Sequence, residues 1–260
     1  DVCSSDLGSI SVDLKCTLDL SGWTGGTISR INITDSSNYP ANEREAGLIV
    51  GPDAGTIQEL SFGNNQLDTI MRTKLSGGSY DRIYVAAHSK EVQLGSLLAE
   101  GYAFQSSDGT YLDYTQTLQG SYIYNLTVVK CPHAKVENGT CAYCNTENIA
   151  AMVDDTIYSS VADAIDAWLA GGEKLILYAD YDIPDVTWQV NGEHTLDMNG
   201  HKLTSGTISL GNGMDLTLLD RVGGRSSQAM IESLTVNNGA KLTMEDGYIG
   251  MLKVENVADG

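Results

Sequence analysis

Residues Asn212–Asp220 read NGMDLTLLD, and the same pattern returns as NGAKLTMED at Asn238–Asp246. Each copy opens with an Asn-Gly pair, which readily takes the positive φ of a tight corner. Each then alternates apolar residues with polar ones, which is typical of a half-buried strand. Short strands that return after about 26 residues favour a solenoid whose stacked coils bury one side of every strand. A β-sandwich is the alternative, since it also consists of many short strands.

A longer repeat covers most of the chain. The segment Cys16–Gly22 (CTLDLSG) matches His194–Gly200 (HTLDMNG). Three further pairs keep the same order: Gly26–Ser29 with Gly206–Ser209, Ile57–Phe62 with Ile231–Val236, and Gly78–Val85 with Gly247–Val254. Their spacing drifts along the chain, which is what insertions in loops between fixed strands produce. The sequence therefore predicts two truncated copies of one all-β solenoid module in tandem.

One helix is predicted over residues 160–172. Ser160 can cap its start, and a Gly-Gly pair ends it. Its apolar face consists of Val161, Ala164, Ile165, Trp168 and Leu169. An open solenoid end exposes apolar core and an unpaired strand edge, so we expect this helix to cap that end. A partner-binding helix is the weaker alternative, because the apolar face is needed within the module.

A cluster of cysteines and one histidine lies between the two copies. Cys131-Pro132-His133 is followed by Cys141-Ala142-Tyr143-Cys144, with Gly139 in the connecting loop. Tetrahedral zinc takes four such ligands, and a two-residue gap lets both thiolates of a Cys-x-x-Cys pair reach one ion. We expect Cys131, His133, Cys141 and Cys144 to hold one structural zinc ion, with no open position for catalysis. Disulfides among these cysteines are the alternative in an exported protein.

Composition excludes several classes of partner. The 260 residues include 34 acidic and 15 basic side chains, which gives a formal charge of −19. Such a chain has no electrostatic attraction to nucleic acid or to anionic lipid. No run of about 18 apolar residues is present, so we expect no membrane insertion. Hydrophobic residues make up 42% of the chain, enough for a sizeable core.

The expected organisation has four parts. Residues 1–7 read DVCSSDL, which resembles one reading frame of a short-read sequencing adapter; we expect an assembly scar, with a native leader as the alternative. Residues 8–130 form the C-terminal part of the first module, and residues 131–148 the Cys/His linker. Residues 149–260 hold the capping helix and the N-terminal part of the second module. We therefore expect the chain to be a fragment of a longer protein.

Together these features resemble the large repeat-bearing surface proteins of gut-dwelling Gram-positive bacteria, in which β-helix modules alternate with Cys-x-His … Gly-x-Cys-x-x-Cys linkers. The resemblance rests on Leu97–Phe104, Cys131–Cys144, Tyr158–Trp168 and Thr195–His201. It implies a right-handed parallel β-helix, export, and an extracellular place on the bacterial cell surface. Some proteins of this kind bind host immunoglobulins or glycans, but no binding residue can be carried over.

Two classes of function are weighed. The first is a non-enzymatic module for binding, display or adhesion, whose partners are a host surface glycan or protein and further modules of the same chain. The second is a carbohydrate-active β-helix, either a polysaccharide lyase or a glycoside hydrolase, which needs paired carboxylates or calcium ligands. Candidate acids are Asp154, Asp155, Asp180, Asp182, Asp197 and Asp220. Asp197 recurs as Asp19, so it occupies a repeated coil position, and we predict no catalytic residue.

Tyrosines offer one further candidate surface. Tyr80, Tyr84, Tyr111, Tyr114, Tyr122 and Tyr124 could stack on sugars or contact an antibody. Tyrosine is also common in strands, and packing within the sheet is the interpretation that we favour.

Overall fold

The computed structural model describes residues 7–13, 16–34, 46–63, 72–87, 89–222 and 230–255. The chain divides into two compact units. Unit 1 is Asp1–Lys135 with Cys141–Thr146, and unit 2 is Val136–Thr140 with Glu147–Gly260. Both consist mainly of strands, which confirms the all-β class. The expected scar at residues 1–7 lies outside the described residues except for Leu7, which opens the first strand.

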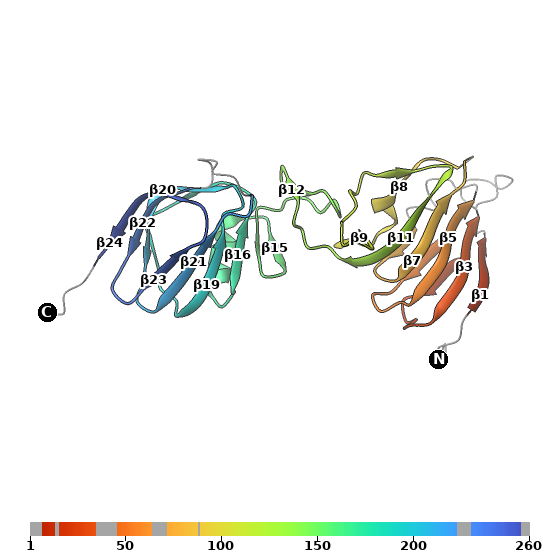
Figure 1. Ribbon diagram of the computed structural model, residues 1–260, viewed down its shortest axis with the longest axis horizontal. Coiled ribbons are helices and arrows are strands. Elements are labelled where there is room, and N and C mark those ends of the chain that lie inside the picture. The colour runs from red at the N-terminus through yellow and green to blue at the C-terminus, as the bar shows by residue number, and fades with distance from the viewer. Residues whose placement is uncertain are drawn as a thin grey trace. The chain divides into compact units, whose positions relative to one another are not determined.

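Unit 1 is built from two parallel sheets that the chain visits in turn. One sheet contains β1 (Leu7–Asp13), β3 (Thr27–Thr34), β5 (Thr56–Gly63) and β7 (Ser79–Val85), which pair in that order. The other contains β2 (Thr17–Leu20), β4 (Gly47–Val50) and β6 (Thr73–Leu75). Every pass of the chain therefore adds one parallel strand to each sheet, and the first sheet appears as red to yellow arrows side by side in Figure 1.

Antiparallel strands end this parallel run. The long strand β11 (Ser121–Lys130) pairs antiparallel with β7 on one side and with β9 (Tyr102–Ser106) on the other. The remaining short elements of unit 1 are β8 (Val92–Gln93), the 3₁₀ helix η2 (Leu94–Leu97) and β10 (Thr117–Leu118). Strands β12 (Val136–Glu137) and β13 (Thr140–Cys141) pair with each other in the loop between His133 and Cys144.

The core of unit 1 follows from the parallel register. Ile31, Leu60 and Ile83 are partners on neighbouring strands and are fully buried. The same holds two residues further on, for Ile33, Phe62 and Val85. Corresponding inward positions thus stack from strand to strand, and burial of each such side chain stabilises the fold by about 1.5–3 kcal/mol.

Unit 2 repeats the two-sheet arrangement. Its first sheet has the order β15 (Thr156–Tyr158), β14 (Ala151–Val153), β16 (Lys174–Leu177), β19 (Gly192–Asp197), β21 (Met214–Leu219) and β23 (Lys241–Met244). Its second sheet contains β17 (Tyr181–Ile183), β18 (Val186–Trp188), β20 (Lys202–Leu210), β22 (Met230–Val236) and β24 (Tyr248–Val254). From β16 onward all of these pairings are parallel.

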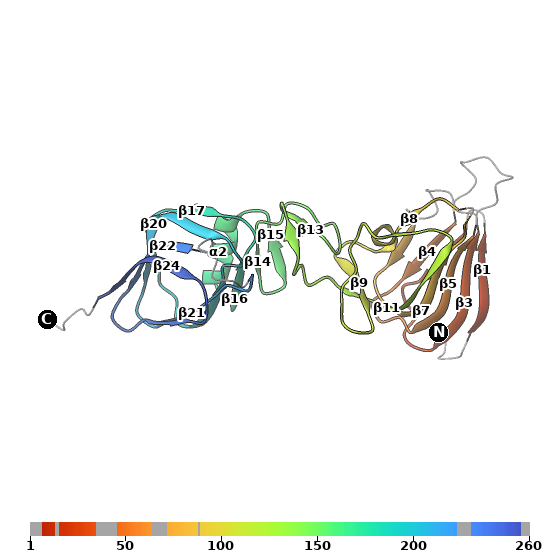
Figure 2. The ribbon, with the colours of Figure 1, turned by 45° about the horizontal axis from the view of Figure 1, so that its top comes forward.

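The predicted helix is present as α2 (Val161–Leu169), the one α-helix in the described part of the chain. The Ser160 hydroxyl accepts a hydrogen bond from the Asp163 amide at 3.3 Å, as expected of an N-cap. The helix packs against β14, β15 and β16 (Figure 2). Its Trp168 is fully buried, with its ring edge-on to that of Trp188. Among the described residues, no helix is long and apolar enough to cross a membrane.

Candidate functional site

The structure brings all four predicted metal ligands together. The ligand atoms of Cys131, His133, Cys141 and Cys144 lie within 4.8 Å of one another. The Sγ atoms of Cys131 and Cys141 are 3.5 Å apart, and Cys144 Sγ is 3.5 Å from His133 Nδ1. With Zn–S bonds of about 2.3 Å and Zn–N bonds of about 2.0 Å, the ligand atoms of a tetrahedral site are about 3.5–3.8 Å apart. The cluster could therefore bind a metal ion such as zinc.

The cysteine spacing does not match that of a disulfide. The four described cysteines, Cys16, Cys131, Cys141 and Cys144, are all free. The 3.5 Å between the Sγ atoms of Cys131 and Cys141 is well beyond the bond length of about 2.05 Å. Cys131, Cys141 and Cys144 are buried, whereas Cys16 is exposed.

Backbone hydrogen bonds hold the loop that carries the ligands. The Ala142 amide donates to Lys135 O at 2.9 Å, and the Cys141 amide donates to Thr146 O at 2.9 Å. The chain reverses through residues with positive φ, among them His133 at 47° and Gly139 at 76°. The His133 amide also points at Cys131 Sγ, 3.5 Å away. These contacts fold the loop so that the four ligands, which are close in sequence, are also close in space.

The thiols and the imidazole influence each other's protonation. Hydrogen bonds with Cys141 and Cys144 raise the pKa of His133 to about 9. Hydrogen bonds with the same two thiols raise the pKa of Cys131, while hydrogen bonds with Cys131 and Cys141 hold the pKa of Cys144 below its usual range. The cluster therefore favours a thiolate beside an imidazolium, a charge separation that a bound cation would replace. With four protein ligands, such a cation would act as a cross-link.

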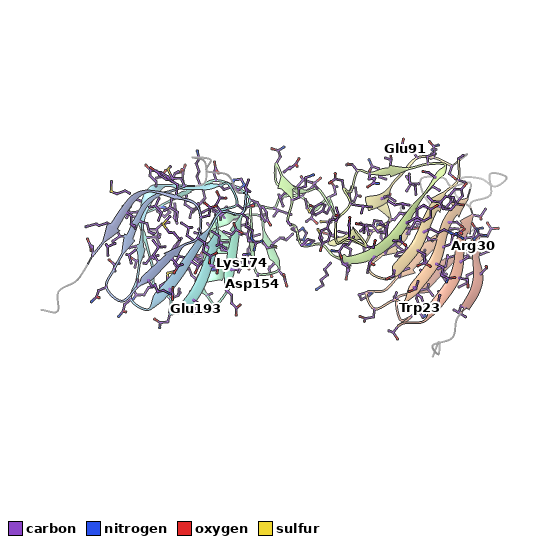
Figure 3. All side chains as sticks on the ribbon, viewed as in Figure 1. Trp23, Arg30, Glu91, Asp154, Lys174 and Glu193 are labelled. Carbon is purple, nitrogen blue, oxygen red and sulfur yellow. The ribbon has the colours of Figure 1, made fainter. Side chains whose placement is uncertain are left out.

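Several candidate carboxylates hold the turns of unit 2. Asp182 accepts hydrogen bonds from the hydroxyls of Thr204 and Ser205, which lower its pKa. Asp154 accepts from the Lys174 amide at 3.0 Å, and both residues lie at the same end of unit 2 (Figure 3). These acids therefore bind the backbone or side chains of a neighbouring strand or coil.

Asp197 and Asp220 serve the same purpose at successive corners. Asp197 accepts from the Asn199 amide at 3.2 Å, just as Asp19 accepts from the Ser21 amide at 2.9 Å. Asp220 accepts from the Gly200 amide, twenty residues earlier in the chain, at 2.8 Å. Burial raises the pKa of Asp197, against the hydrogen bonds that it accepts. A turn contact common to Asp19 and Asp197 favours the structural interpretation of these positions.

A cavity in unit 2 gathers polar groups that the sequence did not group together. Its volume is about 820 Å³, and its lining includes Glu147, Ser159, Tyr178, Asp180 and His201. His201 Nδ1 lies 3.1 Å from Asp180 Oδ1, which also accepts from the Lys202 amide at 3.1 Å. Asp180 therefore combines a turn contact with a position beside an imidazole.

The tyrosines fall into different environments. Tyr80 is buried and its hydroxyl donates to Gly77 O at 3.0 Å, so the packing interpretation fits this residue. Tyr84 and Tyr122 stack with ring centroids 4.4 Å apart, and Tyr124 follows at 5.9 Å from Tyr122. Tyr122 and Tyr124 are 44% and 57% exposed. Tyr84 and Tyr122 are register partners on β7 and β11, so their stacking is packing within the sheet, while parts of the Tyr122 and Tyr124 rings remain exposed.

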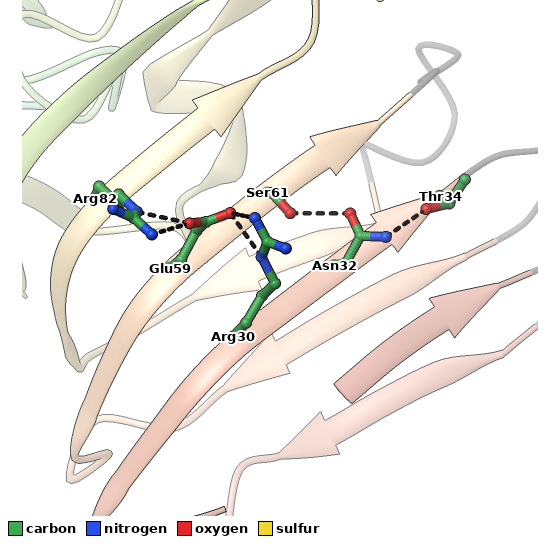
Figure 4. Close-up of polar contacts among 6 residues, drawn as sticks. All are labelled: Arg30, Asn32, Thr34, Glu59, Ser61 and Arg82. Carbon is green, nitrogen blue, oxygen red and sulfur yellow. Dashed lines mark hydrogen bonds and ion pairs between the residues drawn. The ribbon is translucent and has the colours of Figure 1, made fainter. Parts of the chain in front are cut away.

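A row of charged residues crosses the same sheet of unit 1. Glu59 on β5 binds Arg30 on β3 through Nε at 2.7 Å and Arg82 on β7 through Nε at 2.6 Å (Figure 4). Each arginine adds a second contact through Nη2 to the same carboxylate oxygen. Beside this row, Ser61 donates to Asn32, which in turn donates to Thr34. Sequence reasoning missed the row, because it exists only once the strands are in register.

Comparison with known proteins does not identify the chain. No family model, curated protein or solved structure matches it. Its function must therefore be inferred from the contacts described above.

Proposed function

We propose that the chain is a non-enzymatic binding and display module of an exported bacterial surface protein, built from two right-handed parallel β-helix units. Parallel strands that alternate between two sheets support this architecture. Segments that match in sequence also lie in corresponding strands: Ile57–Phe62 falls in β5, which follows β3, and Ile231–Val236 falls in β22, which follows β20. Helix α2 is the cap of the second β-helix.

The functional proposal rests on the hydrogen bonds that the candidate carboxylates accept within the fold. Asp154, Asp182, Asp197 and Asp220 each accept hydrogen bonds from a neighbouring strand or coil. A polysaccharide-cleaving site needs carboxylates directed at the scissile bond. A carboxylate that is hydrogen-bonded within a turn of the fold is not directed at a substrate. The outer surfaces of the sheets are therefore the parts left for recognition, with host surface glycans or proteins as partners and further modules of the same chain beside it.

The test is to incubate the chain with a panel of acidic and neutral polysaccharides. We expect no release of reducing or unsaturated ends, together with binding to at least one glycan or immunoglobulin in a parallel screen. Measurable release of ends would overturn the proposal. Absence of binding across the screen would also contradict it and leave only a spacer role.

In this proposal the Cys/His cluster is a structural zinc site. Two of the distances among its ligand atoms, both 3.5 Å, match a tetrahedral site, and all four atoms lie within 4.8 Å of one another. Protein would fill every position, so the ion would order residues 131–146 without a catalytic role. Protein purified without chelator should contain about one zinc per chain by elemental analysis. Absence of metal, with a mass two protons lower for each cystine, would favour the disulfide alternative.

A carbohydrate-active function is the second candidate, and the cavity of unit 2 is the observation that favours it. Glu147 and Asp180 supply two carboxylates to one cavity, and His201 contacts Asp180. If this cavity cleaves polysaccharide, the release of ends should disappear in Glu147→Gln. Release that survives this substitution would exclude the cavity as its source.

A further inference from the structure

The outer face of the β3–β5–β7–β11 sheet carries two rows of side chains in register. In the first row Arg30, Glu59, Arg82 and Tyr124 each come from a different strand. In the second row Asn32, Ser61, Tyr84 and Tyr122 occupy the same four strands. Neighbouring strands are about 4.8 Å apart, so each row extends over roughly 14 Å. We call Arg30, Arg82, Tyr84, Tyr122 and Tyr124 the Arg/Tyr face.

Buried Glu59 holds both arginines in place. Its side chain is only 3% exposed, whereas the side chains of Arg30 and Arg82 are half-exposed. Each guanidinium uses Nε and Nη2 toward Glu59, and this leaves its Nη1 group and the outer Nη2 hydrogen for other acceptors. Exposed Asp81, next to Arg82, offsets part of the positive charge. Recognition would thus depend on the fixed donors of the guanidinium groups more than on net charge.

The tyrosines continue this face with aromatic surface. Tyr84 packs against one ring face of Tyr122, and the planes of Tyr122 and Tyr124 are within 23° of parallel. Tyr124 is the register partner of Arg82, so a guanidinium and an exposed ring lie on adjacent strands. Flat, half-exposed rings beside fixed N–H donors suit a ligand with apolar C–H faces and hydrogen-bonding edges.

The small exposed apolar area of the face favours a sugar chain over a protein partner. Among the described residues of unit 1, Tyr122 and Tyr124 are the only exposed large hydrophobic side chains. A stable protein interface needs a buried apolar core, which the face lacks. An extended sugar chain laid across the strands would place ring faces on tyrosine and carboxylates within reach of arginine, whose planar fork matches carboxylate geometry.

We propose that the Arg/Tyr face binds an extended glycan that carries carboxylate groups, as uronic and sialic acids do. The inference rests on the proposed binding role of the chain and names the site and the ligand class. Tyr122 and Tyr124 stack on the sugar rings, and Arg30 and Arg82 bind the carboxylates.

The experiment titrates the whole chain with oligogalacturonate and with its methyl ester, and in parallel with sialyllactose and with lactose. We expect binding to at least one acidic member and at least tenfold weaker binding to its neutral counterpart. The double variant Tyr122→Ala/Tyr124→Ala should lose about tenfold in affinity, since it removes both exposed rings of the face. Arg30→Gln should lose affinity for the acidic ligand alone, because Arg82 still neutralises Glu59.

The matched control is Tyr248→Ala, which removes a 54% exposed tyrosine from unit 2 and should leave affinity unchanged. Circular dichroism verifies that each variant is folded. Equal binding of acid and ester, or affinity unaffected by the tyrosine and arginine variants, would overturn the assignment while leaving a binding role elsewhere on the chain. Binding of an immunoglobulin but of no glycan would overturn the ligand class. Cleavage of the glycan would instead overturn the proposed non-enzymatic function.

Discussion

Truncation of Trp168 should destabilise unit 2 selectively. Trp168 lies on the inner face of α2, and its side chain is fully buried. Its ring centroid is 5.2 Å from that of Trp188 and 5.4 Å from that of His194. A tryptophan buries about 150–250 Å², which at about 25 cal/mol per Å² corresponds to roughly 4–6 kcal/mol. Its Nε1 is buried without a hydrogen-bond partner in the structure, which reduces this stabilisation by about 1–3 kcal/mol. The cavity left by the ring adds to this loss, so we expect Trp168→Ala to lower the free energy of unfolding by about 3–4 kcal/mol.

The assay is differential scanning calorimetry together with urea unfolding followed by circular dichroism. Unit 1 has its own hydrophobic core, so its transition should stay in place while that of unit 2 shifts. For a unit of this size, a loss of 3–4 kcal/mol corresponds to a fall in Tm of roughly 10–20 °C.

The comparison with Trp168→Phe tests the reasoning. Phenylalanine keeps an aromatic ring and removes the unpaired N–H, so its cost should be about 1 kcal/mol or less. Equal destabilisation by Phe and Ala would show that ring burial is not the cause. A shift of less than about 1 kcal/mol for the alanine variant would refute the claim that α2 secures this end of unit 2.

Three further outcomes are expected. Cys141→Ser should reduce bound zinc from about one per chain to near zero by elemental analysis, and retained zinc would refute the four-ligand site. Burial opposes ionisation of Glu59, but Arg30 and Arg82 outweigh it and hold its pKa below the usual value. That stabilisation is lost as pH falls through the lowered folded-state pKa. Glu59→Gln should therefore flatten the pH dependence of the free energy of unfolding on the acid side of pH 4.5, and an unchanged slope would contradict this. Gly206→Ala should lower the free energy of unfolding by more than about 2 kcal/mol, because the added Cβ would lie 2.3 Å from Ile183 O. The control Gly101→Ala, at an open position with positive φ, should cost about 1 kcal/mol. Equal costs for the two variants would exclude steric contact as the cause.

Local features of the chain could be predicted from sequence. The helix at Val161–Leu169 was found because its cap, apolar face and terminator lie within thirteen residues. The metal ligands came together for the same reason, since fourteen residues span Cys131 to Cys144 and the intervening loop has few ways to close. Strands such as β21 were recognisable from their alternation of buried and half-buried positions.

Features that depend on register between distant strands could not be predicted. Arg30, Glu59 and Arg82 each read as an ordinary surface charge, because nothing within one strand shows which residues the neighbouring strand places beside it. A one-residue slip of β5 would turn Glu59 to the opposite face of the sheet. The tyrosines posed a related problem. Tyr80 and Tyr84 lie four residues apart on β7, where regular alternation would place them on one face, yet Tyr80 is buried and Tyr84 is half-buried because the alternation breaks at the exposed pair Asp81 and Arg82.

The Arg30–Glu59–Arg82 row carries a desolvation penalty that uncharged residues at these strand positions would avoid. A carboxylate that is 3% exposed must be desolvated, and even with two half-exposed arginine partners it is often no more stabilising than apolar residues of similar volume. The inner face of the sheet already supplies the core at Ile31, Leu60 and Ile83, so the outer face needs no buried charge for stability. What the row does accomplish is to fix two half-exposed guanidinium groups in defined orientations beside stacked tyrosines. Preorganised donors of this kind lower the entropy lost on binding, and that benefit exists only if the outer face of this sheet has a ligand.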